Sequence, residues 1–368
     1  MMSEKLTGGI AQGDTNGVGY ELILKVLGDN RMTELFTPVL IGSSKVASFY
    51  RKKIVDQEEG GNVSLNLVQK PEEAAEGRNN IINCLDDEFK VEPGAESQAS
   101  DQAAVTSLKM GLDFVDRNRL DFMVSAPMGD NAFSVENAAS LIQYLAARYE
   151  TDFLLPLFIG RHIKMAFLSS AKNFNEAISN LTVENIVQRL KMMNRALVRD
   201  FSKDKPMMAV LALNASVGDG MFGEEEEKII KPAIQSVRDE GIMACGPYAA
   251  DRFFAERIYE KFDAVLVLHN DQGMIPFKSV EEYGGSVLIA GLPFVFTTTV
   301  GGMAFDIAGK GTAEETSMRD AVYLAIDVYR NRKQYSELTR NHLRHYEIGG
   351  DRRESEMNVE QIAGLSKD

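Results

Sequence analysis

The sequence predicts an α/β protein with a largely parallel sheet, because short apolar strands alternate with amphipathic helices along most of the chain. Three stretches carry this prediction: a strand, turn and helix over 8–27, an apolar strand at 264–268, and a clear helix over 317–332. At 368 residues the chain is too long for one simple core. We therefore expect two lobes.

The N-terminal part supplies the first strands and helices of this pattern. Glycine-rich residues 13–19 lack both the Gly-Lys-Ser/Thr of a P-loop and the Gly-x-Gly-x-x-Gly spacing, so we expect a tight turn there. The polar stretch 56–61 is predicted to be a surface loop. Strands are predicted at 8–11, 38–42, 63–68 and 120–125, and helices at 20–27, 45–53 and 98–117.

The C-terminal part continues the alternation. Thr182 is a candidate N-cap. The acidic run 224–227 is typical of a solvated helix start, and the charged tail from Gly349 is expected to be mobile. Strands are predicted at 164–169, 206–213, 264–268 and 286–296, the last interrupted by Gly291-Leu292-Pro293, and helices at 182–201, 224–240, 253–261 and 317–332.

Composition narrows the class of partner. A net charge of −14 argues against nucleic acid or an anionic membrane, although a local basic pocket could still hold a small anion. Cys84 and Cys245 form no Cys-x-x-Cys pair, so neither a disulfide framework nor a thiolate zinc site is expected. No signal peptide or membrane-length apolar run is recognisable, which predicts a cytoplasmic protein.

The segment 268–278 is the most informative, because polar side chains follow a buried strand. Ligands of α/β proteins bind at the carboxyl ends of strands, so this segment is a candidate site wall. Asp271 and Lys278, with Asp251, could bind substrate or move protons. The alternative, a surface ion pair in a loop, is favoured by residue type alone.

A second candidate is the turn 214–223, which holds three glycines and Asp219 before a helix start. Backbone N–H groups in such a turn could hold a phosphate or pyrophosphate. A connecting loop without a ligand explains the same residues equally well.

Taken together, the motifs resemble the 4-hydroxythreonine-4-phosphate dehydrogenase (PdxA) family. They follow the family's order over roughly residues 8–335. The matching segments are Gly9-Ile10-Ala11-Gln12-Gly13-Asp14-Thr15-Asn16-Gly17-Val18-Gly19, Leu211-Ala212-Leu213-Asn214 with Gly218-Asp219-Gly220, Gly246-Pro247-Tyr248-Ala249-Ala250-Asp251, Asp271-Gln272-Gly273 with Pro276 and Lys278, Ala290-Gly291-Leu292-Pro293, and Ala304 to Ala313.

The resemblance implies the two-lobed fold of isocitrate and isopropylmalate dehydrogenases, with a cleft between the lobes. It places residues 1–128 and 297–348 in a first, discontinuous lobe, 129–296 in a second lobe with the dimer interface, and 349–368 in the tail. Family members are homodimers that use NAD and a divalent metal on a small phosphorylated substrate. The carried-over positions are Asp251, Asp271 and Lys278 for catalysis, and Asn214, Gly218, Asp219, Gly220 and Gln272 for NAD.

The sequence departs from the family at the metal. Three histidines bind it in the family, and the matching positions here are Ala171, Ser216 and Asn270. Alanine has no ligand atom, and serine and asparagine bind zinc-like ions weakly, so we expect no ordinary metal binding. His269 is adjacent to Asn270, but neighbouring residues of a strand face opposite ways. We therefore predict that His269 is a poor substitute.

The substrate side is altered as well. Phe296 stands where the family has a phosphate-binding arginine, Val287 stands where it has an asparagine, and Gly301 stands where it has a histidine. Asp130 matches a lysine of the family, and residues 137–140 match its Gly-His-Thr-Glu segment. Losing the arginine removes a bidentate phosphate contact.

Three hypotheses follow from these departures. The chain retains the fold and dimer with the usual dehydrogenase chemistry lost or badly weakened. Alternatively, it is a metal-independent oxidoreductase on a less charged substrate, with Phe296 and Val287 lining an apolar pocket. Or it is a binding or regulatory subunit that pairs with an active paralogue.

Overall fold

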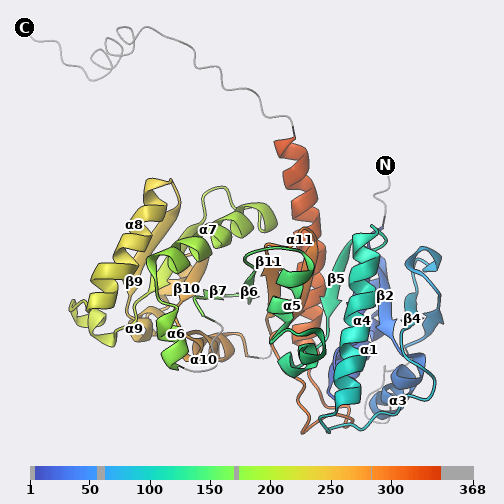
Figure 1. Ribbon diagram of the computed structural model, residues 1–368. Helices are drawn as coiled ribbons and strands as arrows, with labels where there is room; N and C mark the ends of the chain where they lie inside the picture. Colours follow the sequence, from blue (N-terminus) through green and yellow to red (C-terminus); the bar gives the residue numbers. More distant parts are fainter. Residues whose placement is uncertain (1–4, 56–62, 170–173, 283, 341–368) are drawn as a thin grey trace, which may run out of the picture. The chain divides into compact units, whose positions relative to one another are not determined.

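A computed structural model describes residues 5–55, 63–169, 174–282 and 284–340 (Figure 1). Residues 1–332 form one compact unit and 333–368 another, of which the end of one helix is described. The predicted loop at 56–61, the tail from Gly349 and the position of Ala171 lie outside the described residues.

The described part of the chain contains twelve strands in one sheet. Their order is β3-β4-β2-β1-β5-β12-β11-β6-β7-β10-β8-β9. They are β1 Thr7–Ala11, β2 Thr37–Gly42, β3 Leu65–Leu67, β4 Asn79–Asn83, β5 Phe122–Ser125, β6 Leu155–Ile159, β7 Lys164–Phe167, β8 Met207–Leu211, β9 Met243–Tyr248, β10 Ala264–Val267, β11 Ser286–Ala290 and β12 Val295–Thr299.

The sheet is parallel except around β11 and β6, which pair antiparallel with each other and with β12 and β7. The predicted α/β class with a largely parallel sheet is confirmed. The glycine and proline of residues 291–293 separate β11 from β12, as the interrupted strand pattern predicted.

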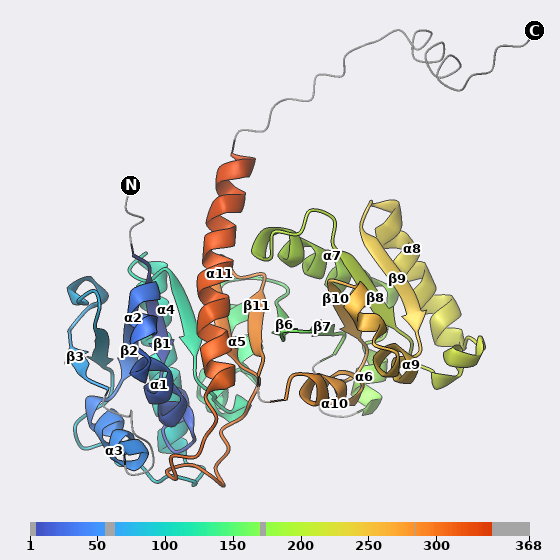
Figure 2. The same ribbon diagram turned by 180° about the vertical axis from the view of Figure 1, so that it is seen from behind.

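The α-helices lie mostly between successive strands. They are α1 Gly19–Gly28, α2 Asn30–Leu35, α3 Ser44–Val55, α4 Gln98–Asp116, α5 Leu141–Arg148, α6 Phe174–Ser179, α7 Val183–Asp200, α8 Lys231–Asp239, α9 Ala250–Ala255, α10 Asn270–Val280 and α11 Thr316–Thr339. Thr182 caps α7 as predicted, since its side chain accepts a hydrogen bond from the backbone N–H of Asn185. Seen from behind in Figure 2, α7 and α8 lie beside the strands β8 to β10.

Three predicted elements differ from the structure. The helix expected over 224–240 is present over 224–239, but it contains a π-helical segment, Glu226–Ile230, before α8. The helix expected over 253–261 breaks at Arg257, whose φ of 55° is left-handed, leaving α9 and a 3-10 turn, Ile258–Lys261. Residues 270–280, read as a strand-end loop, form α10 despite Gly273 and Pro276.

The turn after β1 is the tight, internal turn that the sequence predicts. Gly13 has a φ of +68°, and a Cβ there would lie 2.4 Å from the backbone oxygen of Pro127. The backbone N–H of Asn16 donates to the carboxylate of Asp14, 3% of which is exposed. Within this turn, the Asp14 carboxylate therefore satisfies the backbone N–H of Asn16.

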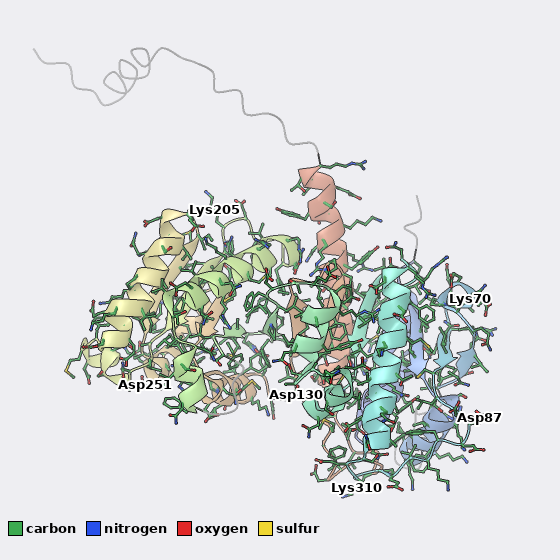
Figure 3. The ribbon with its side chains drawn as sticks, in the orientation of Figure 1. Lys70, Asp87, Asp130, Lys205, Asp251 and Lys310 are labelled. Carbon is green, nitrogen blue, oxygen red and sulfur yellow. The ribbon has the colours of Figure 1, made fainter. Side chains whose placement is uncertain are left out.

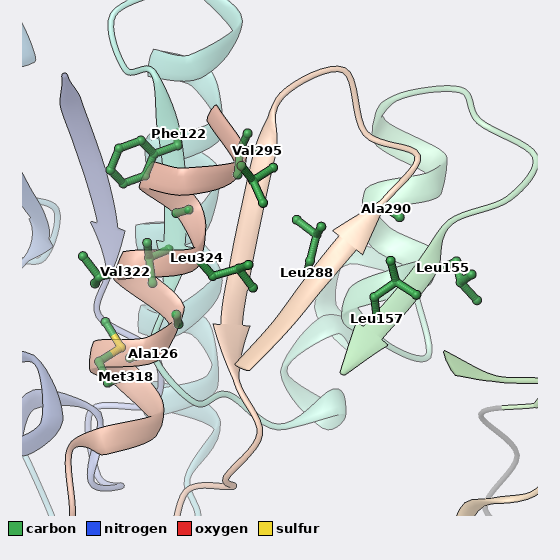
Figure 4. Packing of buried hydrophobic residues seen from close by; sticks show 14 of the residues in the cluster. Phe122, Ala126, Leu155, Leu157, Leu288, Ala290, Val295, Met318, Val322 and Leu324 are labelled. Atoms are coloured by element: carbon green, nitrogen blue, oxygen red, sulfur yellow. The ribbon is translucent and has the colours of Figure 1, made fainter. Parts of the chain in front are cut away.

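Helix α11 covers part of the sheet core. Met318, Val322 and Leu324 belong to the same buried cluster as Phe122 of β5 and Val295 of β12 (Figure 4). Burial of each such side chain contributes about 1.5–3 kcal/mol. Among the described residues no helix is long and apolar enough to cross a membrane.

Candidate functional site

Three neighbouring strands end at one pocket. Strands β10, β8 and β9 are adjacent and parallel, so their carboxyl ends share one edge of the sheet. The segments that follow them line a pocket of about 360 Å³. The lining residues are Ala212, Leu213, Asn214, Ala215, Ala250, Asp251, His269, Asp271 and Gln272.

Most of the predicted site residues meet here. Asp251, near the start of α9 and labelled in Figure 3, and Asp271, in the first turn of α10, are both exposed and both line the pocket. Asn214 and Gln272 line it too. Lys278 lies two turns further along α10, is exposed, and does not line the pocket, so the structure does not bring it to the two aspartates.

Gln272 joins two strand ends. Its side-chain oxygen accepts a hydrogen bond from the backbone N–H of Leu268 at 2.8 Å. Its side-chain nitrogen donates to the backbone oxygen of Ala212 at 2.7 Å. The amide therefore ties the end of β10 to the end of β8 and fixes the pocket wall, with both of its polar atoms already engaged.

The turn after β8 contains a buried carboxylate that sequence reasoning missed. Glu226 is fully buried, whereas the acidic run 224–227 was expected to be solvated throughout. Its oxygens accept hydrogen bonds from the backbone N–H groups of Leu213 at 2.9 Å, Asn214 at 3.0 Å and Gly223 at 2.9 Å. The Asn214 side chain donates to it at 2.8 Å.

These bonds fix the charge state of Glu226. Burial raises the pKa of Glu226, but the hydrogen bonds from the Asn214 side chain and the backbone N–H groups outweigh it, so the net pKa is lowered. The carboxylate thus accepts hydrogen bonds from backbone N–H groups that the sequence suggested as a phosphate-binding site. A short 3-10 helix, Ala215–Asp219, contains Gly218 and Asp219. Gly220 ends this helix, and its backbone N–H donates a hydrogen bond to the backbone oxygen of Val217.

His269 lines the pocket as the N-cap of α10. Its Nδ1 accepts a hydrogen bond from the backbone N–H of Gln272 at 3.4 Å, and its ring meets Phe174 edge-on at 5.2 Å. Burial lowers the pKa of His269, and the charge of Asp271 opposes this only in part. Strand alternation does not apply here, because β10 ends at Val267. The strand argument for calling His269 a poor substitute therefore does not hold, and whether His269, which lines the pocket, could replace a metal ligand stays a prediction.

The residues at the family's metal positions do not fit a metal. The Ser216 hydroxyl donates to the backbone oxygen of Met221 at 3.1 Å, and the Asn270 side chain is exposed and lies 3.4 Å from the Asp271 carboxylate. Within the described residues no three His, Cys, Asp or Glu side chains converge. The donor set is thus one hydroxyl and one amide, both weak ligands for zinc-like ions.

Phe296 and Val287 do not line an open pocket. Phe296 is fully buried and Val287 is 6% exposed, and both belong to one core cluster. The structure therefore does not favour the hypothesis that Phe296 and Val287 line an apolar binding pocket, since both pack in the protein core. A second, polar cavity of about 520 Å³, between α1, α2, β3 and β4, contains none of the predicted site residues.

Comparisons with known proteins agree on one family. A family model described as "Pyridoxal phosphate biosynthetic protein PdxA" matches residues 34–325. The chain is 37% identical over 348 residues to a 4-hydroxythreonine-4-phosphate dehydrogenase of Bacteroides thetaiotaomicron, covering 94% of each chain. It is 31% identical to an Oceanobacillus iheyensis protein provisionally named D-threonate 4-phosphate dehydrogenase, covering 89% of this chain and 99% of the relative.

A solved structure shares the fold. The 4-hydroxythreonine-4-phosphate dehydrogenase of Klebsiella pneumoniae superposes with a TM-score of 0.74 at 25% identity, covering 89% of this chain and 98% of that one. The predicted α/β dehydrogenase fold is confirmed by this likeness.

Proposed function

The chain belongs to the PdxA family, and we propose that it binds a small molecule in the strand-end pocket while the family's metal-dependent dehydrogenase reaction is lost or badly weakened. One observation carries the proposal. Asp251, Asp271 and Gln272 line the pocket, whereas Ser216 and Asn270 occupy two of the three positions at which the family resemblance implies metal-binding histidines. The third, Ala171, has only a methyl side chain.

The same reasoning applies to the cofactor. NAD is the cofactor expected from the family, and the turn after β8 was its predicted pyrophosphate site. Glu226 already accepts hydrogen bonds from two backbone N–H groups of that turn, those of Asn214 and Gly223, and from that of the preceding Leu213. A pyrophosphate placed there would meet a buried carboxylate of the same charge, which opposes binding. We therefore assign no nicotinamide cofactor to this turn.

The test is a dehydrogenase assay with a related enzyme as its control. The full chain and the B. thetaiotaomicron relative are assayed side by side with 4-phosphohydroxythreonine, NAD and Zn²⁺ or Mg²⁺, following NADH absorbance. We expect the chain to be slower by at least about a thousandfold, since Lewis-acid stabilisation supplies several kcal/mol of the barrier reduction. A rate within tenfold of the relative would refute the proposal.

A matched variant distinguishes the loss of metal ligands from misfolding of the site as the reason for a lost activity. The triple substitution Ala171→His, Ser216→His and Asn270→His supplies the family's ligands. We expect Zn²⁺ to raise the melting temperature of this variant and to leave that of the parent chain unchanged. An equal Zn²⁺ effect on both proteins would show that the parent binds metal by another route.

We propose two lobes, 1–128 with 297–348 and 129–296, and a homodimer, which sedimentation at several concentrations would test. No feature of the described residues favours a regulatory pairing with an active paralogue, and co-purification from the native cell would reveal one.

A further inference from the structure

His269 occupies a place in the pocket that its sequence position did not reveal. It follows β10, caps α10 and lines the pocket together with Asp271 and Gln272. The edge-on contact with Phe174 holds one side of the ring. The ring is thus fixed by a hydrogen bond on one nitrogen and by an aromatic neighbour.

The cap bond determines where the ring carries its proton. Nδ1 accepts the backbone N–H of Gln272, so Nδ1 bears no proton. A neutral imidazole has one N–H, which must then be on Nε2. Among residues 5–55, 63–169, 174–282 and 284–340, Nε2 has no hydrogen-bond partner. Within the part of the chain that the structure describes, Nε2–H is therefore a donor without an acceptor.

The other lining residues that the structure describes supply acceptors and no positively charged side chain. Asp251 and Asp271 contribute carboxylates, while Asn214 and Gln272 have side chains engaged with the protein. No lysine or arginine is found among the described lining residues. Two carboxylates and an uncharged donor favour a ligand with hydroxyl groups and a neutral oxygen acceptor, and disfavour a phosphate.

We propose that His269 recognises the ligand as a fixed, uncharged Nε2–H donor to a carbonyl or hydroxyl oxygen, and that the ligand carries no phosphate. The inference rests on the proposed function only in placing the ligand in this pocket. It makes His269 a specificity-determining residue. A metal bound at Nε2 would move the proton to Nδ1 and break the bond to Gln272, so His269 does not replace the lost metal ligands.

Nuclear magnetic resonance of the ¹⁵N-histidine-labelled full chain tests the tautomer directly. His269→Asn identifies the signal, since Asn keeps an N-cap acceptor while the ring is removed. At pH 7 we expect a protonated Nε2 and an unprotonated Nδ1 for His269. A protonated Nδ1, an imidazolium, or two exchanging tautomers would overturn the proposal.

Two additions to the same sample test recognition. Zn²⁺ should leave the His269 signals unchanged, with exposed His162 as the internal comparison, and a zinc-bound Nε2 would overturn the proposal. Dihydroxyacetone at millimolar concentration should shift the Nε2 signal in the parent chain, and dihydroxyacetone phosphate should shift it less. No shift with dihydroxyacetone, or a larger one with its phosphate, refutes the ligand class.

The outcomes are independent of the dehydrogenase assay. A chain that proves to be an active metal-dependent enzyme refutes the proposed function whichever nitrogen carries the proton. A wrong tautomer in an inactive chain refutes only the role of His269.

Discussion

Glu226 and Glu281 have the same structural role at two places in the molecule, because each carboxylate accepts hydrogen bonds from the backbone N–H groups of a turn. Glu226 closes the turn after β8, beside the pocket, by accepting three backbone N–H groups. Glu281, 7% exposed, does the same for the turn between β6 and β7, which does not border the pocket. Its partners are the N–H groups of Arg161 at 2.8 Å, His162 at 2.7 Å and Ile163 at 3.1 Å.

The comparison shows that a cluster of backbone N–H groups in this chain is not by itself a ligand site. Both clusters are satisfied by a side chain of the protein, and only their surroundings differ. The Glu226 cluster shares Leu213 and Asn214 with the pocket, so a change there should reach the ligand. A change at Glu281 should alter stability alone.

The largest expected effect comes from removing either carboxylate. Glu226→Ala and Glu281→Ala should each lower the free energy of unfolding by about 3 kcal/mol, because three backbone N–H groups lose a charged acceptor. Glu224→Ala, at an exposed neighbour paired with Lys228, should change it by less than about 0.5 kcal/mol. Urea unfolding measures all three, and a Glu226→Ala variant as stable as Glu224→Ala would break the comparison.

Chemical rescue should separate the two sites. In Glu226→Ala the vacated N–H groups border the pocket, so added inorganic phosphate should bind and restore about 1 kcal/mol of stability at five times its dissociation constant. Glu281→Ala should gain much less, because the N–H groups of Arg161, His162 and Ile163 do not border the pocket. Melting temperatures with phosphate, against equal ionic strength of chloride, measure this. Equal rescue of both variants would show that proximity to the pocket is irrelevant.

The sequence predicts the framework of this site better than its chemistry. The apolar run before Leu268 and the polar residues after it predict a strand end at a pocket, and β10 confirms it. Helix α10 was missed because Gly273 and Pro276 oppose a helix locally, while tertiary packing of Phe277, which is fully buried, favours it.

The role of Glu226 could not be read from its neighbours. It is one of four consecutive glutamates, and only contacts distant along the chain distinguish the buried one. The pocket position of His269 was missed for a related reason. The prediction assumed that β10 continued through it, whereas the chain turns into a helix and the ring enters the pocket wall.

A smaller effect is expected from acid. The lowered pKa of Glu226 means that its stabilisation is fully present above the ordinary glutamate pKa, about 4.3, and is lost as pH falls through the lower folded value. Glu226→Gln cannot titrate there. Unfolding free energies at a series of pH values below about 5 should therefore fall more steeply for the parent chain than for this variant. Parallel curves would mean that Glu226 does not titrate differently in the folded and unfolded states.

The smallest expected effect on stability is at His269, whose uncharged ring nitrogen accepts a hydrogen bond from a single backbone N–H group. His269→Ala should lower the free energy of unfolding by about 0.5–1 kcal/mol, since the Gln272 N–H loses its cap. His269→Asn should recover most of this loss, because its side-chain oxygen can accept the same bond. Urea unfolding of both variants measures the difference. If both variants lose the same free energy of unfolding, the 3.4 Å hydrogen bond does not act as a helix cap. A neutral acceptor for one N–H group would then not be comparable with a carboxylate that accepts three.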